Sequence, residues 1–149
     1  MTLFIILVAL AIFATRHSST FWFLALPGTI MHESLHWITG KILGARPYDF
    51  SVVPSYGPDH VTYGSVSFEN FNTFNAAPTA LAPLLGIPLA LLAWPFVQGI
   101  EDFWSKLFAI WCLAAVLAQS LPSQADWAVA LRHPVGLVGW AGAGTYFLL

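Results

Sequence analysis

The chain has 149 residues, of which 58% are hydrophobic and 8% are charged. An average soluble domain is about 45–50% apolar and about 25% charged, so this composition excludes an ordinary soluble domain and a disordered chain. It predicts a multi-pass protein embedded in the lipid bilayer. The net charge is −2 without a basic stripe, so we expect no nucleic-acid partner. A single cysteine excludes an intramolecular disulfide and a multi-cysteine metal site.

Five apolar stretches approach the length of about 20 residues that a helix needs to cross a bilayer. They are Thr2–Thr15, Phe21–Leu43, Ala76–Val97, Phe103–Leu121 and Pro134–Leu149. The first lacks the basic residues that begin a signal peptide and is predicted to be a span. The third contains several prolines and is expected to kink, the fourth can continue past Pro122 to Arg132, and the last is marginal in length. We therefore predict an all-α membrane protein with four or five transmembrane helices in a single domain, residues 1–149.

The longest segment that is not apolar, Gly44–Asn75, has the pattern of a β-hairpin. Asp49–Val53 and Val61–Phe68 are rich in valine, aromatic residues and alternating small polar residues. Between them, Pro54–Asp59 is rich in the residues that form turns. The pattern predicts a small hairpin that rests on the membrane face or dips into it.

Ionisable residues stand in the middle of the second apolar stretch, where they are costly and therefore indicate function. The sequence there reads His32-Glu33-Ser34-Leu35-His36. In a helix, His32 and His36 lie on one face, about 40° apart and one turn along the axis, so both imidazoles can bind one tetrahedral ion. Glu33 stands beside them without being forced to ligate. This is the H-E-x-x-H pattern of zinc metalloproteases, in which the glutamate is the general base.

A catalytic zinc ion needs a third protein ligand and keeps its fourth position for water. His36 lies about 10 Å before the end of its predicted helix, so the third ligand should enter from the membrane face reached at that end. Asp126 follows the fourth apolar stretch on the same face, and Pro122 can kink the chain so that the carboxylate turns inward. Asp126 is therefore the favoured ligand and Glu69 the reserve. The alternative role for Asp126 is a charge at a helix N-terminus, with Ser123 as the cap.

The motif His32-Glu33-x-x-His36 in an apolar helix, followed by Pro122-Ser123-Gln124-Ala125-Asp126 after a later one, resembles the site-2 protease family. These proteins are intramembrane zinc metalloproteases with a three-helix catalytic core. The resemblance covers roughly residues 21–132, and it implies Zn²⁺ bound by His32, His36 and Asp126, with Glu33 as the catalytic residue. It also implies hydrolysis of peptide bonds in or near the transmembrane segments of membrane-protein substrates.

Two segments are expected to contact such a substrate. Many family members carry Gly-Pro-x-x-Asn in the middle core helix, where this chain has Ala77-Pro78-Thr79-Ala80-Leu81. Asn72 and Asn75 either fill the role of the missing asparagine or are turn residues at a helix start. A transmembrane substrate must unwind before cleavage, and an exposed hairpin edge either holds the unwound stretch as an added strand or only shields the metal from lipid. The edge residues are Val61, Thr62, Tyr63, Gly64, Ser65 and Val66.

Three other functions remain open on the sequence. A membrane zincin resembling the CAAX-type prenyl proteases would use a glutamate as its third ligand, but Glu101 lies on the opposite membrane face. A non-catalytic zinc-binding membrane protein would keep the metal without cleaving a substrate. A metal transporter would need polar residues along a path across the bilayer, whereas here they gather at one depth.

Overall fold

The computed structural model describes residues 2–14, 21–57 and 61–148, which are mostly helical with a small antiparallel hairpin. The helices are α1 (Thr2–Ala14), α2 (Phe21–Ile42), α3 (Ala76–Ala80), α4 (Gly86–Gly99), α5 (Phe103–Gln119), α6 (Gln124–Arg132) and α7 (Pro134–Leu148), with a 3₁₀ turn, η1 (Ala82–Leu85), before α4. The strands are β1 (Pro47–Ser51), β2 (Ser55–Tyr56), β3 (Val61–Thr62) and β4 (Ser65–Phe68).

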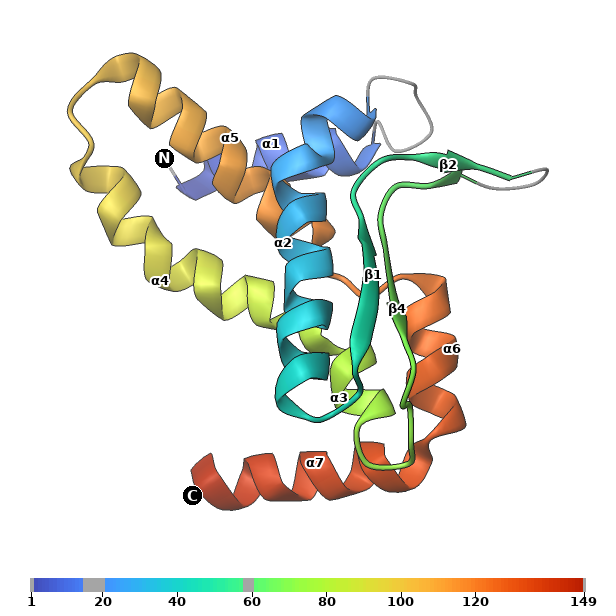
Figure 1. Ribbon diagram of the computed structural model, residues 1–149. Coiled ribbons are helices and arrows are strands. Elements are labelled where there is room, and N and C mark those ends of the chain that lie inside the picture. The colour runs from blue at the N-terminus through green and yellow to red at the C-terminus, as the bar shows by residue number, and fades with distance from the viewer. Residues whose placement is uncertain (1, 15–20, 58–60, 149) are drawn as a thin grey trace.

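Helices α2 and α5 form the centre of the helical part, and α5 also packs against α1 and α4 (Figure 1). Small residues allow α2 and α5 to approach closely. A Cβ atom at Gly28 would lie only 2.1 Å from the carbonyl oxygen of Ala115, and Ala25 and Ala114 are fully buried in the same cluster. Small residues at helix contacts are typical of helices that pack inside membranes.

The prediction of one kinked helix over Ala76–Val97 is wrong, because the structure divides this stretch into α3, η1 and α4. A proline lacks the N–H that continues a helix, and Pro83 stands at the break within η1. The short helix α3 is buried and packs against α2, α6 and α7. The break therefore places the short buried helix α3 against α2, where a continuous span was predicted.

The fourth apolar stretch also divides, and α5 and α6 are bent by 45° at their junction. Asp102 caps the start of α5, since the Ser105 N–H donates to its carboxylate at 2.7 Å and lowers the pKa of that carboxyl. Helix α5 ends at Gln119, three residues before Pro122, and the chain resumes as α6 at Gln124. The predicted continuation past Pro122 is therefore a second, reoriented helix.

By length and composition, one described helical stretch, Ala82–Gly99, suffices to cross a membrane, and the bent pair α5–α6 is a second if it is taken as one span. This is fewer than the four or five predicted. Helices α1 and α7 have 13 and 15 residues, and α2 has 22 but carries the polar residues of the motif in its middle. Helix α7 runs across the end of the molecule at which α2 terminates (Figure 1).

The hairpin is present, but it is longer than predicted. Strand β1 pairs with β4, with Ser51 opposite Ser65, and β2 pairs with β3 farther along the same ribbon. The prediction of a turn over Pro54–Asp59 is wrong for Ser55 and Tyr56, which are paired with Thr62 and Val61. Residues 58–60 lie outside the described part of the chain. The ribbon lies beside α2, and the Trp22 indole N–H anchors it by donating to the Val52 carbonyl at 3.0 Å.

Candidate metal centre

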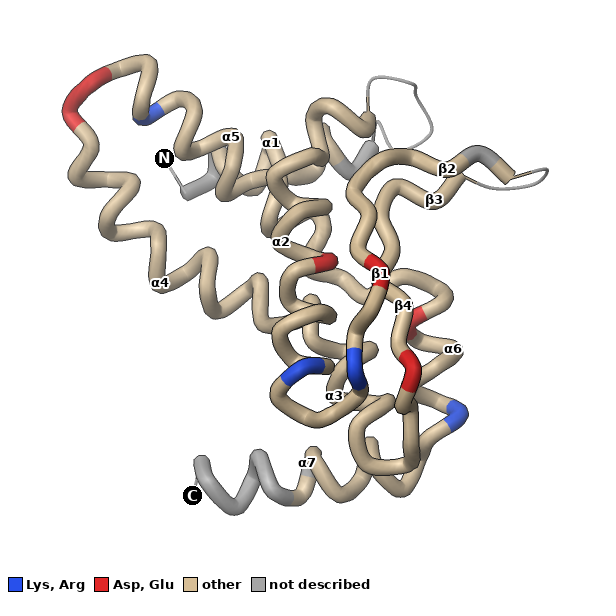
Figure 2. The backbone as a smooth tube through the Cα atoms, viewed as in Figure 1, with Lys and Arg blue, Asp and Glu red and all other residues tan. Residues whose placement is uncertain are grey.

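His32, His36 and Asp126 come together although they lie far apart in sequence. The two histidines project from the middle of α2, and Asp126 stands in the first turn of α6. One ligand atom from each residue lies within 4.8 Å of the others, so the group can hold a metal ion. Figure 2 marks an acidic position in the middle of the α2 backbone.

The hydrogen bonds of the histidines leave one lone pair of each ring free for a metal. The Nδ1 atom of His32 lies 2.7 Å from the Gln119 carbonyl oxygen, and that of His36 lies 2.8 Å from the Thr79 carbonyl oxygen. A carbonyl oxygen only accepts hydrogen bonds, so both Nδ1 atoms carry the proton and donate it. The two Nε2 atoms then present lone pairs to the group. A backbone carbonyl on the second ring nitrogen is the usual support of a metal-binding histidine.

The distances among the ligand atoms fit a small tetrahedral ion. The two Nε2 atoms are 3.1 Å apart, His32 Nε2 is 3.4 Å from Asp126 Oδ2, and His36 Nε2 is 3.3 Å from Asp126 Oδ1. Ligand bonds of about 2.0 Å in tetrahedral geometry separate neighbouring ligand atoms by about 3.3 Å. Lone pairs that converge at this spacing repel one another unless a cation lies between them. The residues present therefore fit a zinc-sized ion.

Asp126 makes the capping interaction and also belongs to the group that could hold a metal ion. The Ser123 hydroxyl accepts from the Asp126 N–H at 3.2 Å, and the Ser123 N–H donates to Asp126 Oδ2 at 2.7 Å. These two bonds form a capping box at the start of α6. The same carboxylate lies beside both histidines, and the capping bond to Oδ2 leaves Oδ1 the less occupied oxygen. The cap therefore orients the carboxylate toward the metal group.

Glu33 lies next to this group without belonging to it. Its side chain is buried, with 6% exposed, and the hairpin covers it at the junction between β3 and β4. A Cβ atom at Gly64 would lie 2.6 Å from Glu33 Oε1, 2.8 Å from Glu33 Cγ and 2.9 Å from Thr29 Cγ2. Only glycine allows the hairpin backbone to approach the carboxylate this closely. Gly64, one of the hairpin residues predicted to bind substrate, thus lies against Glu33 of the motif.

The other hairpin residues surround this contact. Val61 and Thr62 form β3 and are exposed, and Ser65 and Val66 begin β4. The Tyr63 ring packs edge-on against Phe21 with ring centroids 4.8 Å apart. Within the described part of the chain, β4 pairs only with β1, so its other edge has no strand partner.

The asparagine side chains are held by backbone groups at the entry to α3. Asn72 Oδ1 accepts from the N–H groups of Phe74 and Asn75, and Asn75 Oδ1 accepts from the Asn72 N–H. Asn75 Nδ2 donates to the carbonyls of Asn70 and Leu43. Leu43 lies about 10 Å along α2 from His36. These contacts correspond to the turn role of the two residues, and their contact with a substrate stays a prediction.

Sequence reasoning missed the two residues whose carbonyls support the histidines, Thr79 and Gln119. Their side chains give no sign of this role, because the backbone oxygen makes the contact. The available signal was a proline soon after each of them, Pro83 and Pro122. Glu69, the reserve ligand, follows β4 and is not part of the metal group.

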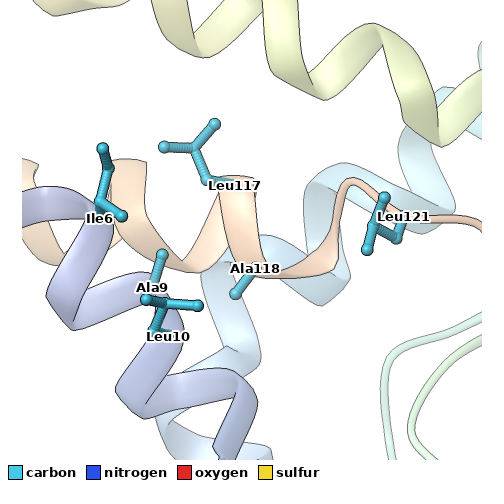
Figure 3. A pocket seen from close by; sticks show the side chains of 6 residues that line it. All are labelled: Ile6, Ala9, Leu10, Leu117, Ala118 and Leu121. Atoms are coloured by element: carbon cyan, nitrogen blue, oxygen red, sulfur yellow. The ribbon is translucent and has the colours of Figure 1, made fainter.

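Two surface cavities of the described residues do not include the metal group in their linings. An apolar groove of about 300 Å³ lies between α1 and α5 and is lined by Ile6, Ala9, Leu10, Leu117, Ala118 and Leu121 (Figure 3). A second cavity of about 280 Å³ is lined by Ser34, Trp37, Ile38 and Phe50. Neither lining contains a titratable side chain, so the chemistry of the site comes from the histidine and carboxylate groups on α2 and α6.

Comparison of the chain with protein-family models, with curated proteins and with solved structures finds no match. The class of the site therefore depends on its own geometry. Two imidazoles and one carboxylate, with the histidine tautomers set by backbone carbonyls, define a candidate metal centre with a buried glutamate beside it.

Proposed function

We propose that this chain is an intramembrane zinc metalloprotease of the site-2 protease type, in which His32, His36 and Asp126 bind Zn²⁺ and Glu33 is the general base. The observation that carries the proposal is the convergence of the three groups, with one ligand atom from each within 4.8 Å of the others and Glu33 buried next to them. Three ligands from the protein leave a fourth position for water, as in catalytic zinc sites.

Zinc is the metal that this ligand set favours among the common ions. Calcium and magnesium take oxygen ligands in larger coordination shells, whereas two imidazoles with one carboxylate in tetrahedral spacing suit zinc. The third ligand is an aspartate, and Glu101 lies in the loop between α4 and α5, outside the group. These features favour the site-2 protease type over a membrane zincin with a glutamate ligand.

The proposed reaction is hydrolysis of a peptide bond. A bound zinc ion supplies Lewis-acid activation of the water and of the scissile carbonyl. Glu33 accepts a proton from the attacking water as the oxygen bonds to the carbonyl carbon, and it returns the proton to the amine nitrogen when the C–N bond breaks. The Thr79 and Gln119 carbonyls hold the imidazoles in place throughout. Gly64 lies against Glu33, and its lack of a side chain leaves room for the carboxylate.

A bilayer setting is supported by the apolar surface of α4 and α5. Large hydrophobic side chains project outward from both helices, and the most exposed are Leu91, Leu92, Phe96, Phe103 and Trp104. A soluble monomer rarely exposes so continuous an apolar surface. The substrate expected in this setting is a transmembrane segment of another protein. The unpartnered edge of β4 offers one means of holding it once it has unwound.

The test is cleavage of a model transmembrane peptide by the purified chain in lipid vesicles. We expect Glu33→Gln to reduce the rate by at least about 100-fold, the usual contribution of a general base, with zinc still bound. Glu69→Gln, an exposed substitution outside the metal group, is the matched control and should cleave at the wild-type rate. A Glu33→Gln variant that cleaves as fast as the wild type would contradict the proposal.

A further inference from the structure

We propose that Pro83 and Pro122 are positioning residues of the metal centre, because each leaves one backbone carbonyl without a helical donor and so makes it available to a histidine. The inference relies on the proposed function for the identity of the metal. It concerns how the chain prepares the two imidazoles before any metal binds.

Pro83 acts on the Thr79 carbonyl. In an α-helix, the carbonyl of a residue accepts from the N–H four positions later, and for Thr79 that position is Pro83, which has no N–H. Helix α3 ends at Ala80, and the following turn is 3₁₀. The Leu81 N–H at the C-cap of α3 points to the Thr79 carbonyl from only two positions later, which is not a helical bond, and the carbonyl accepts from His36 Nδ1 at 2.8 Å. Thr79 is fully buried and packed against α2, so water does not replace the missing donor.

Pro122 acts on the Gln119 carbonyl together with the capping box of α6. A continued α-helix would supply the Ser123 N–H and a 3₁₀ turn would supply the N–H of residue 122. Residue 122 is proline, and the Ser123 N–H donates to Asp126 Oδ2 at 2.7 Å. Both helical donors are therefore removed. The Gln119 carbonyl accepts from His32 Nδ1 at 2.7 Å.

The two prolines therefore produce one chemical result at two places. Each histidine keeps its proton on Nδ1 and its lone pair on Nε2, where the Asp126 carboxylate lies. An N–H at residue 83 or 122 would compete for the carbonyl and release the imidazole to other tautomers and rotamers. Loss of such a supporting partner lowers metal affinity by about 10–100-fold in other metal sites.

The experiment measures Zn²⁺ affinity of the full chain in detergent, by competition with a chromophoric chelator. Two variants are compared at each proline. One is Pro83→Ala, which adds an N–H, and the other places lactate at position 83, which has the same methyl group but an ester oxygen in place of the N–H. Both remove the buried proline ring, so they share any packing loss. Circular dichroism and thermal unfolding establish that each variant is folded. The same pair is made at position 122, and Pro95→Ala, inside α4 and remote from the group, is the control.

We expect the alanine variants to bind Zn²⁺ about 10–100-fold more weakly than the wild type, and the lactate and Pro95→Ala variants to bind within about threefold of it. An alanine variant that unfolds while its lactate partner folds and binds zinc also supports the inference. Alanine variants that bind like the wild type, or lactate variants that lose as much affinity as the alanine variants, would overturn it. A wild-type chain that binds no zinc would instead refute the proposed function.

Discussion

Asp126 shows at the scale of one residue how one side chain can serve both a capping interaction and the proposed metal site. Its Oδ2 accepts the Ser123 N–H, and both oxygens lie beside the histidines. A capping box alone stabilises the start of a helix. Here it also fixes the direction of a carboxylate that must meet two imidazoles from another helix.

Two substitutions separate these roles. Asp126→Asn keeps an oxygen that can accept from the Ser123 N–H but removes the charge, so we expect zinc affinity to fall by more than the 10–100-fold of a lost supporting partner, with thermal stability nearly unchanged. Ser123→Ala removes the hydroxyl cap and should lower the free energy of unfolding by about 1 kcal/mol while zinc stays bound. Chelator competition and thermal melts measure the two effects. Normal zinc affinity in Asp126→Asn would transfer the third-ligand role to another residue.

The position of the Glu33 carboxylate depends on its neighbour Gly64, which has no side chain. Gly64→Ala places a methyl group within 3.0 Å of Glu33 and Thr29, so the carboxylate or the hairpin must move. A displacement of about 1 Å in an active site can cost about 100-fold in rate, and we expect cleavage of the model peptide to fall by that amount with zinc retained. Gly99→Ala, where a Cβ meets no atom within 4 Å, is the control. Equal rates in both variants would show that Gly64 does not position Glu33.

At the scale of secondary-structure elements, the site depends on the contact between α2 and α5. Helix α2 carries both histidines, and the end of α5 supplies the carbonyl that holds His32. The contact is close because Gly28 faces the Ala115 backbone. The Gln119 side chain adds a hydrogen bond to Thr29 Oγ1 at 3.2 Å. A change in the spacing of the two helices therefore changes the position of His32.

Gly28→Ala tests this coupling. The added methyl group would overlap the Ala115 carbonyl, and overpacking of this kind costs about 1–3 kcal/mol. We expect a lower melting temperature together with weaker zinc binding, because the helices must separate. Gly139→Ala, which meets no atom within 4 Å, should change neither quantity. A Gly28→Ala chain with lower stability but full zinc affinity would show that the packing of α2 on α5 does not determine zinc binding.

The elements also show which parts of the fold are predictable. The spacing of His32 and His36 follows from helical periodicity, and the two main strands follow from the aromatic and small polar residues of β1 and β4. The break at Pro83 does not follow from the sequence, since a proline in an apolar stretch is compatible with either a kink or a new element. The supporting carbonyls of Thr79 and Gln119 were not predictable from side chains. They depend on where a helix ends and on which element then packs against it.

At the scale of the whole molecule, charged residues are scarce, so the few that are buried are strong indications of function. The described chain places Glu33 and Asp126 in partly or fully buried positions beside two histidines, in surroundings where an unpaired charge is costly. A metal ion bound by the group would offset this cost, because it would neutralise the Asp126 carboxylate and accept the converging lone pairs. Helix α3, which contacts His36, and the hairpin, which contacts Glu33, close the site from two sides.

The central claim is that two imidazoles and one carboxylate of this chain bind one zinc ion. Zinc K-edge X-ray absorption, combined with metal analysis of the purified chain in detergent, tests it most directly. The account predicts about one zinc per chain, four nitrogen or oxygen ligands at about 2.0 Å, and the scattering of two imidazole rings, reduced in His36→Ala. A chain without zinc after exposure to the metal, or a spectrum with sulfur ligands or without imidazole scattering, would contradict it.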